Sequence, residues 1–425
     1  MLVGLGVSNH HTIVLLFPII GLGLVGSLPE SVRRWHRPLL CAFIGFCAGL
    51  TPYLYTWTSA SLTEPVMWGV APTIDGLVRH FLRVDYGTIR FAPTGDAHPL
   101  AQIAFFFRDI LDDGFVILPA LGVVGLARML RSREPGVWVV FVSFLLSGPV
   151  FVLLLNSSPD DAISRETVQR FHCLPSLFLA FFAAFGWMAV CQVRWLSRRM
   201  IALIGVATLI AVVCRSGPLV VARHGPVIEN YCKSSLESLP EHAILVGTGD
   251  QRLFGFIYAQ RALGIRPDVL YIHRTLIASL WYSHGVDNVL RQPLPIRPLE
   301  MIQALLDTGR PVFLANIENK AVANNFATFP LGTAVRVLPP GHRAPALAEV
   351  EDLNLDLWAR MKPDLLPFRP ADSWAAEAQE DYARPWLALA DAYGSSGEHA
   401  AQSRNLARVL QIAPWLVEDR AAGRQ

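Results

Sequence analysis

The stretch FHCLPSLFLAFFAAFGWMAVC, residues 171–191, contains 21 residues and no Asp, Glu, Lys or Arg. A helix of about 20 apolar residues is long enough to cross the roughly 30 Å hydrocarbon core of a bilayer. Five further apolar segments have a similar character, at residues 8–27, 38–57, 114–130, 136–155 and 199–214. We therefore predict an α-helical polytopic membrane domain over residues 1–215, with about six spans.

The composition agrees with a membrane protein. Hydrophobic residues make up 52% of the 425-residue chain and charged residues 16%, whereas soluble domains carry about 25% charged residues. The formal net charge of +2 is too small to indicate nucleic-acid binding. Five of the six cysteines lie in apolar segments and only Cys232 lies in a polar one. We therefore expect neither a disulfide framework nor a metal site built on cysteine pairs.

The distribution of arginine predicts the orientation in the membrane. Three short loops are rich in arginine, and they occupy residues 27–38, 127–134 and 193–200. They alternate with the loops at 58–113 and 156–170, where acids balance or outnumber arginines. Because arginine-rich loops stay in the cytoplasm, the N-terminus and everything after the last span are expected on the opposite face. In a bacterial inner membrane, which we take as the location, that face is the periplasm.

From Ser216 onward the apolar runs become short, which predicts a soluble α/β domain over residues 216–345. A strand at 243–248, a helix at 251–263 and a strand at 268–273 form a βαβ-like unit. RPVFLANI and TAVRVLP supply further strands. Asp250 follows Gly247 and Gly249 at the first strand-to-helix turn, where it is either a helix N-cap or a contact to a polar substrate.

The helical tail, residues 346–425, contains one tetratricopeptide-like helix pair. The residues that carry the pattern are Trp386, Leu389, Tyr393, Gly397, Leu406 and Pro414. A single pair leaves an apolar face uncovered. We therefore expect it to pack on the preceding helices, with peptide binding as the alternative.

Two motifs near the N-terminus have simple explanations. His10 and His11 begin an apolar span, where they lie at the interface or face a polar cavity on the outer side. Adjacent histidines lack the i, i+4 spacing of a helical zinc pair, so no metal is expected. GLGLVG, residues 21–26, fits a dinucleotide-binding pattern but lies inside an apolar span. Small residues there favour close helix packing in lipid.

Several segments together resemble a known family. They are SNHHTIVLLFP, GLTPYLYTWTSA, EPVMWGVAPTIDGLVRHFLRVDYG, RFHCLPSLFLAFFAAFGW, GTGDQRLFGFIYAQRALGIRPDVLYI and RPVFLANI. Their order over residues 1–340 is similar to the multipass O-mannosyltransferase-like family, relatives of the GT-C glycosyltransferases that in bacteria are mostly a membrane domain of unknown function. The resemblance starts after the family's first spans, so the first outer loop with its acidic catalytic motif has no counterpart. It implies a chain that is N-terminally truncated or split, and inactive by itself.

The resemblance implies a GT-C-like membrane domain and transfer of a hexose such as mannose from a polyprenyl-phosphate carrier to a protein or glycan hydroxyl on the outer face. Such transfer needs a carboxylate base and cations near the phosphate. The expected partners are membrane lipids, the lipid-linked donor and the acceptor, and no cofactor is implied. No catalytic residue or metal ligand is assigned. The candidate substrate-binding residues are His10, His11, Glu64, Trp68, Arg79, His80, Arg83, Asp85, Tyr86, Arg170 and Asp250.

The polar loop between the second and third spans supplies most of these candidates. Arg79 and Arg83 are spaced i, i+4, which predicts one face of a short helix, with His80 beside Arg79. These three residues suit phosphate, Trp68 and Tyr86 suit stacking on a sugar, and Glu64 or Asp85 suits hydroxyls. The alternative is an interfacial helix whose arginines touch lipid headgroups. Arg170 is a further phosphate candidate, or it snorkels to the interface.

Two other classes of function remain to be weighed. A non-catalytic membrane scaffold would bind a partner through the extracytoplasmic domain, and it stays open as the alternative. A transporter would need ionisable residues deep within several spans. The predicted spans hold almost none near their middles, which argues against transport.

Overall fold

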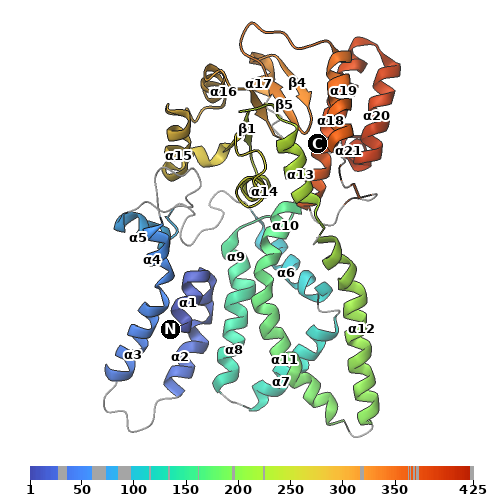
Figure 1. Cartoon of the computed structure of the whole chain (residues 1–425). Helices are drawn as coiled ribbons and strands as arrows, with labels where there is room; N and C mark the ends of the chain where they lie inside the picture. The colour runs from blue at the N-terminus through green and yellow to red at the C-terminus, as the bar shows by residue number, and fades with distance from the viewer. Residues whose placement is uncertain are drawn as a thin grey trace. The chain divides into compact units, whose positions relative to one another are not determined.

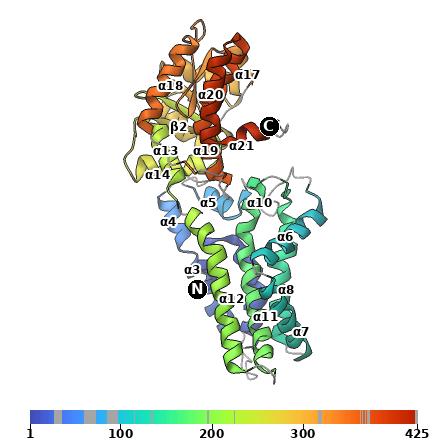
Figure 2. The same ribbon diagram turned by 90° about the vertical axis from the view of Figure 1, so that its right-hand side faces the viewer.

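The computed structural model describes two compact units, which divide between Pro218 and Leu219 (Figures 1 and 2). Helices make up the first unit, and the second contains a sheet with helices on both faces. The residues that the structure describes are 1–26, 36–59, 73–84, 97–113, 116–132, 135–160, 162–193, 197–223, 225–315, 320–361, 363, 365–366, 369 and 373–421.

The first unit is a helical bundle in which α7, α8 and α11 run side by side (Figure 2). Its elements are α1 (Leu2–Asn9), η1 (His11–Leu16), α2 (Phe17–Gly26), α3 (His36–Gly49), α4 (Pro52–Thr58), α5 (Ile74–Phe81), α6 (Pro99–Asp113), α7 (Ile117–Ser132), α8 (Pro135–Leu145), the π-helical η3 (Leu146–Val150), α9 (Phe151–Leu155), α10 (Ala162–Gln169), η4 (Arg170–His172), α11 (Cys173–Cys191) and α12 (Arg198–Arg223).

Within the part of the chain that the structure describes, four helical segments are long and apolar enough to cross a membrane. They are Arg37–Thr58, Gly136–Leu155, Ser164–Cys191 and Arg199–Pro218. They confirm that the predicted spans at 38–57, 136–155, 171–191 and 199–214 are apolar helices of sufficient length. The chain is therefore an integral membrane protein by the length and composition of its helices.

The other two predicted spans are not single unbroken helices. The segment 114–130 falls largely in α7, which lies at 106° to α6, and these two helices pass the test only as a bent pair. The segment 8–27 is interrupted at His10, where the backbone is extended and the side chain accepts a hydrogen bond from the Thr12 N–H. This cap starts a new turn, so a shorter apolar helix, His11–Leu22, follows. The prediction of six spans is not confirmed.

Glycines allow two helix pairs of this unit to touch through their backbones. A Cβ added at Gly125 of α7 would lie 1.8 Å from the Phe182 carbonyl oxygen, and one at Gly186 of α11 would lie 2.0 Å from that of Leu121. Gly4 of α1 approaches α3 in the same way. At Gly21 no atom of the described residues lies within 4 Å of an added Cβ. The close packing predicted for GLGLVG is therefore absent at Gly21.

The second unit combines a five-stranded sheet with helices. Its elements are α13 (Val227–Glu237), β1 (Ile244–Gly247), α14 (Asp250–Arg261), β2 (Leu270–His273), η5 (Arg274–Ala278), α15 (Leu280–Leu290), α16 (Pro298–Asp307), β3 (Val312–Leu314), α17 (Lys320–Asn325), β4 (Thr328–Leu331), β5 (Ala334–Val337), α18 (Leu347–Met361), α19 (Ser373–Ser396), α20 (His399–Ile412) and α21 (Pro414–Ala421).

The strand order is β2-β1-β3-β5-β4. β1 pairs in parallel with β2 and with β3, whereas β5 pairs antiparallel with β3 and with β4. The predicted βαβ unit is therefore confirmed as β1-α14-β2, and the strands in RPVFLANI and TAVRVLP are confirmed as β3 and β5. β4, which contains Pro330, was not predicted from the sequence. Proline is tolerated there because β4 is an edge strand.

The two faces of the sheet pack against different helices. Leu245, Tyr271 and Phe313 share a core with α13, α14 and the tail helices α19 and α20. Ile244 and Ile272 share the opposite core with α15 and α16. Neighbouring strand residues point to opposite faces, which explains this division.

The predicted helix pair of the tail is present as α19 and α20, which pack together. Its pattern residues Trp386, Leu389 and Tyr393 are buried in the same core as the sheet. The expected packing on preceding helices is confirmed, since α19 contacts α13 and α18. The assignment of the pair to the tetratricopeptide class and the alternative of peptide binding stay predictions.

Candidate functional site

The short helix α5 carries part of the candidate site. The Thr73 side chain accepts a hydrogen bond of 3.0 Å from the Gly76 N–H and caps the N-terminus of the helix. The helix ends at Phe81, and Arg83 takes a left-handed conformation with φ of 53°. The prediction that Arg79 and Arg83 share one helix face is wrong, because the chain leaves the helix before Arg83. Strained residues of this kind cluster at functional sites.

His11 connects this turn to the first helices of the unit. Its Nε2 lies 2.8 Å from the Phe81 carbonyl oxygen and 3.4 Å from the Tyr53 hydroxyl. A carbonyl oxygen only accepts, so Nε2 carries the proton and donates to Phe81. The His11 ring also contacts the Phe81 ring, with centroids 5.7 Å apart. These contacts place the turn that holds Arg83 next to η1.

Two adjoining cavities lie beside η1. The first has a volume of about 310 Å³ and contains His10 and Arg170 in its lining. The second has a volume of about 400 Å³ and contains His11 and Arg83. Thr12, Leu15 and Phe151 line both cavities. Most of the remaining lining is apolar: Leu174, Phe171, Phe46, Phe81 and Leu154 are among it. The structure thus combines apolar walls with two arginines and two histidines.

The charged groups at these cavities act on one another. Arg83, His11 and Arg170 all lie within electrostatic range of His10. The His10 ring contacts Phe171, with ring centroids 6.0 Å apart. Guanidinium groups carry their charge at all physiological pH values and present forked donors that match phosphate oxygens. An anionic group attached to an apolar chain is the ligand that suits this combination.

A buried polar network that was not predicted from the sequence supports the turn that carries Arg170. His172 Nδ1 lies 2.5 Å from Asp109 Oδ2, and the Gln169 amide donates a hydrogen bond of 2.6 Å to Asp109 Oδ1. His172 and Asp109 are both buried. Gln169 and His172 flank Arg170 in the sequence, so the network ties the turn that carries Arg170 to α6.

Asp109 was overlooked because residues 58–113 were predicted to be a loop. The structure places residues 99–113 in helix α6 instead. The available signal was the helical spacing of Phe106, Asp109 and Ile110, which are buried together on one face.

The other candidates are distributed as follows. Glu64, Trp68, Asp85 and Tyr86 lie outside the described residues. Arg79 and His80 lie on α5, where the His80 ring is 6.2 Å from the Tyr53 ring.

Asp250 belongs to the second unit and is the first residue of α14. The N-cap of that helix is Gly249, and no side chain caps it, so the N-cap interpretation of Asp250 is wrong. Among the candidates that the structure describes, it brings together His10, His11, Arg83 and Arg170. No group of three or more His, Cys, Asp or Glu that could hold a metal occurs in the described parts of the chain.

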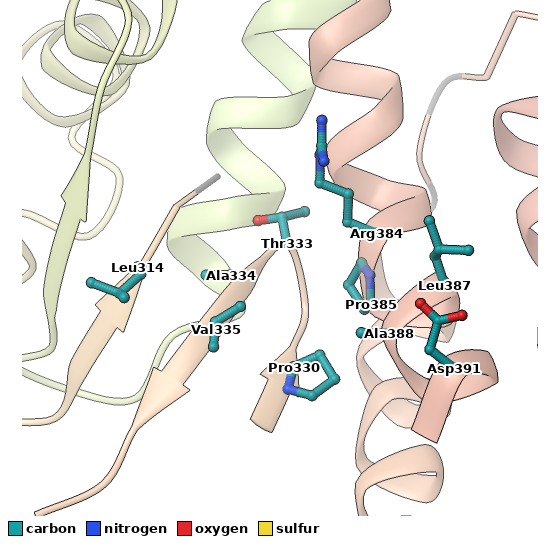
Figure 3. A pocket seen from close by; sticks show the side chains of 10 residues that line it. All are labelled: Leu314, Pro330, Thr333, Ala334, Val335, Arg384, Pro385, Leu387, Ala388 and Asp391. Carbon is teal, nitrogen blue, oxygen red and sulfur yellow. The ribbon is translucent and has the colours of Figure 1, made fainter. Parts of the chain in front are cut away.

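The second unit has a cavity of its own between the sheet and α19 (Figure 3). Its volume is about 180 Å³, and Pro330, Val335 and Ala388 contribute apolar walls. Arg384 and Asp391 of α19 also line it, as Figure 3 shows. Arg384 forms ion pairs with Glu380 and Asp381, and Asp391 accepts from Arg420 at 2.9 Å. These charges are engaged in structural pairs, so we assign no ligand to this cavity.

The sequence has curated relatives. It is 24% identical over 297 residues to "Protein O-mannosyl-transferase TMEM260" of Mus musculus, a match that covers 66% of this chain and 41% of the relative. It is 26% identical over 195 residues to "Protein O-mannosyl-transferase tmem260" of Dictyostelium discoideum, covering 43% of this chain and 23% of that protein. The chain spans less than half the length of these curated relatives.

No family model and no solved structure matches the chain. The two relatives nevertheless establish distant homology to protein O-mannosyltransferases over part of the chain. The resemblance inferred from the sequence segments is thereby confirmed at this level.

Proposed function

We propose that this protein is a membrane glycosyltransferase-like protein that binds a polyprenyl-phosphate hexose, such as the mannose donor, for transfer to a protein or glycan hydroxyl. One observation carries the proposal. His10, His11, Arg83 and Arg170 gather at two adjoining apolar cavities. The homology to protein O-mannosyltransferases gives this cluster its chemical context.

The cluster suits both ends of the donor lipid. The prenyl chain is apolar and matches walls such as Phe46, Phe151 and Leu154. The phosphate gains negative charge as the hexose leaves, and Arg83 and Arg170 would stabilise that charge. The Asp109–His172 network would hold Arg170 in place during transfer.

The base that takes the acceptor proton is a separate question. Asp109 is buried and already bound to His172 and Gln169. It therefore fits a positioning role better than a direct role. Glu64 and Asp85 remain the candidates from the sequence for contact with hydroxyls.

The donor site is tested by replacing each cavity arginine with lysine, which keeps the charge and loses the paired donors. We expect Arg83→Lys and Arg170→Lys each to weaken binding of a short-chain polyprenyl-phosphate mannose by about tenfold or more, since a hydrogen bond to a charged group contributes about 1.5–3 kcal/mol. The measurement is a binding titration of the full chain in lipid nanodiscs.

Arg131→Lys is the matched control, because Arg131 lies in the last turn of α7 and lines neither cavity. Its donor affinity should equal that of the unmodified protein. If the cavity variants bind as tightly as this control, Arg83 and Arg170 only touch lipid headgroups and the donor site is wrong.

We also propose that the second unit faces away from the cytoplasm, as the arginine-rich loops predict. A reporter that is active only outside the cytoplasm should be active when fused after Gln425 and inactive when fused after Arg131. The opposite pattern would place the second unit in the cytoplasm and would remove the case for transfer on the outer face.

A further inference from the structure

The carboxyl edge of the parallel strands in the second unit has the topology of a ligand site. β1 lies between β2 and β3 and is parallel to both. α14 connects β1 to β2 over one face of the sheet, and α15 and α16 pack on the opposite face. The connections therefore change direction at β1. In open α/β sheets, ligands bind outside the carboxyl ends of the strands at such a switch point.

The turn after β1 is shaped by two glycines. A Cβ added at Gly247 would lie 3.0 Å from the Tyr271 hydroxyl and 3.4 Å from the Ala315 Cβ, so a larger side chain would crowd the end of the sheet. Gly249 has φ of 94°, a conformation that favours glycine. Asp250 follows this turn at the first position of α14 and is exposed.

Two buried polar atoms at this edge lack a partner. Tyr271 and His273 are 8% and 5% exposed, and the Tyr271 hydroxyl and His273 Nε2 form no hydrogen bond within the described residues. The other His273 polar groups are engaged, because Nδ1 lies 3.0 Å from Thr275 Oγ1 and the backbone N–H donates to the Tyr282 hydroxyl. Unsatisfied buried groups are rare and call for an explanation.

The same two residues lie on the side of the sheet that α14 covers. Tyr271 belongs to the core that includes α14, and His273 follows it by two strand positions, so both side chains point to that face. Their rings are 6.5 Å apart. His273 is also the register partner of Gly247. The Tyr271 hydroxyl and His273 Nε2 therefore lie close to the turn that carries Asp250.

The charge at this edge selects the class of ligand. Asp250 acts electrostatically on both Tyr271 and His273. Arg252, the first cationic residue of α14, forms an ion pair with Asp381 at 2.6 Å. An anion would therefore meet the Asp250 carboxylate without compensation from Arg252. A neutral ligand with several hydroxyls fits, because a carboxylate accepts two hydrogen bonds while imidazole and phenol groups donate or accept.

We propose that the carboxyl edge of β1 and β2 is a second binding site, and that it takes a neutral carbohydrate. Asp250 accepts hydrogen bonds from two neighbouring sugar hydroxyls, and His273 Nε2 and the Tyr271 hydroxyl bind the next polar groups of the ring. This site lies in the other unit from the donor cluster and does not depend on it. Its occupant would be a soluble glycan rather than a lipid.

The test is a titration of the full chain with methyl α-mannopyranoside in nanodiscs, which avoid sugar-based detergents. Histidine labelled with ¹⁵N reports the His273 Nε2 resonance, identified by its loss in His273→Gln. We expect that resonance to shift on addition of the mannoside. Asp250→Asn and Tyr271→Phe should each weaken binding by about tenfold, the effect of losing roughly one hydrogen bond to a charged or buried group.

Two matched controls separate this site from the rest of the protein. Glu300→Gln changes an acidic residue in the first turn of α16, which packs on the sheet face opposite to α14, and should leave mannoside affinity unchanged. Arg83→Lys should also leave it unchanged, so a failed donor site and a failed carbohydrate site give different results.

Parallel titrations with methyl glucoside, methyl galactoside and inorganic phosphate define the ligand class. Binding of any of the glycosides with the expected loss in Asp250→Asn supports the proposal. It is overturned if no glycoside moves the His273 resonance in the unmodified protein, a result that does not depend on whether a variant folds. It is also overturned if phosphate binds instead and Asp250→Asn strengthens that binding.

Discussion

Arg252→Met is expected to lower the unfolding free energy of the second unit by about 3–5 kcal/mol. Arg252 and Asp381 are each 2% exposed, and their side chains are joined at 2.6 Å. The Tyr231 hydroxyl also donates to Asp381, at 2.6 Å. Without the Arg252 guanidinium, the buried Asp381 carboxylate keeps only the ion pair with Arg384, at 3.4 Å, and the cost of that poorly compensated charge produces the loss.

The reactivity of the Cys232 thiol can report this unfolding, because Cys232 is fully buried in the core that α13, α14 and α19 share with the sheet. Burial raises the pKa of its thiol to about 12, so little of the reactive thiolate forms near neutral pH while the unit is folded. Alkylation of Cys232, followed by mass spectrometry across a urea series, therefore reports unfolding of this unit. In Arg252→Met the alkylation transition should move to much lower urea.

The control is Arg297→Met, which removes an exposed arginine paired with Glu300 at 3.2 Å. Exposed pairs contribute about 0–1 kcal/mol, so the transition should hardly move. The double variant Arg252→Met/Asp381→Leu should recover part of the loss, because it removes the stranded carboxylate. If the alkylation transition of Arg252→Met occurs at the same urea concentration as that of Arg297→Met, the buried network does not stabilise the second unit.

Gly186→Ala is expected to destabilise the first unit, by about 1–3 kcal/mol or more. The added methyl group would lie 2.0 Å from the Leu121 carbonyl oxygen, and backbone atoms cannot move aside as a side chain can. α7 and α11 must separate instead, which loses their packing contacts. Since η4 leads directly into α11, the separation also displaces Arg170 from the proposed donor site.

Gly21→Ala is the matched control, since it makes the same chemical change in another apolar helix, where no described atom lies within 4 Å of the added Cβ. Alanine favours helix over glycine by about 1 kcal/mol, so this variant should be neutral or slightly stabilising. The measurement is the midpoint of thermal unfolding of each variant in nanodiscs. An equal midpoint for Gly186→Ala and Gly21→Ala would show that α7 and α11 do not meet at Gly186.

The apolar helices at 38–57, 136–155, 171–191 and 199–214 were predictable because the requirement is local. In lipid a helix satisfies its own backbone hydrogen bonds, so a long apolar run is enough to specify it. The strands β1 and β2 with α14 between them were predictable for a related reason, since short apolar runs around an amphipathic segment indicate a βαβ unit. None of these elements depends on a distant partner for its type.

Only part of the candidate site could be predicted from local sequence patterns. The sequence marked His10, His11, Arg83 and Arg170 as polar groups near apolar segments, and it did not show that they meet. Their meeting depends on the left-handed turn at Arg83, the break at His10 and the hydrogen bond from His11 to Phe81.

Residue types and hydrophobic periodicity thus determined which segments are membrane helices and which form an α/β sheet. Only tertiary packing decided that Asp109 meets His172 and that Arg252 meets Asp381. It also decided that the Tyr271 hydroxyl and His273 Nε2 have no hydrogen-bond partner among the described residues. The physical reason is distance along the chain. Periodicity reports the environment of neighbouring residues, whereas a buried polar pair forms between segments far apart in sequence once helix and sheet packing has brought them within hydrogen-bond range.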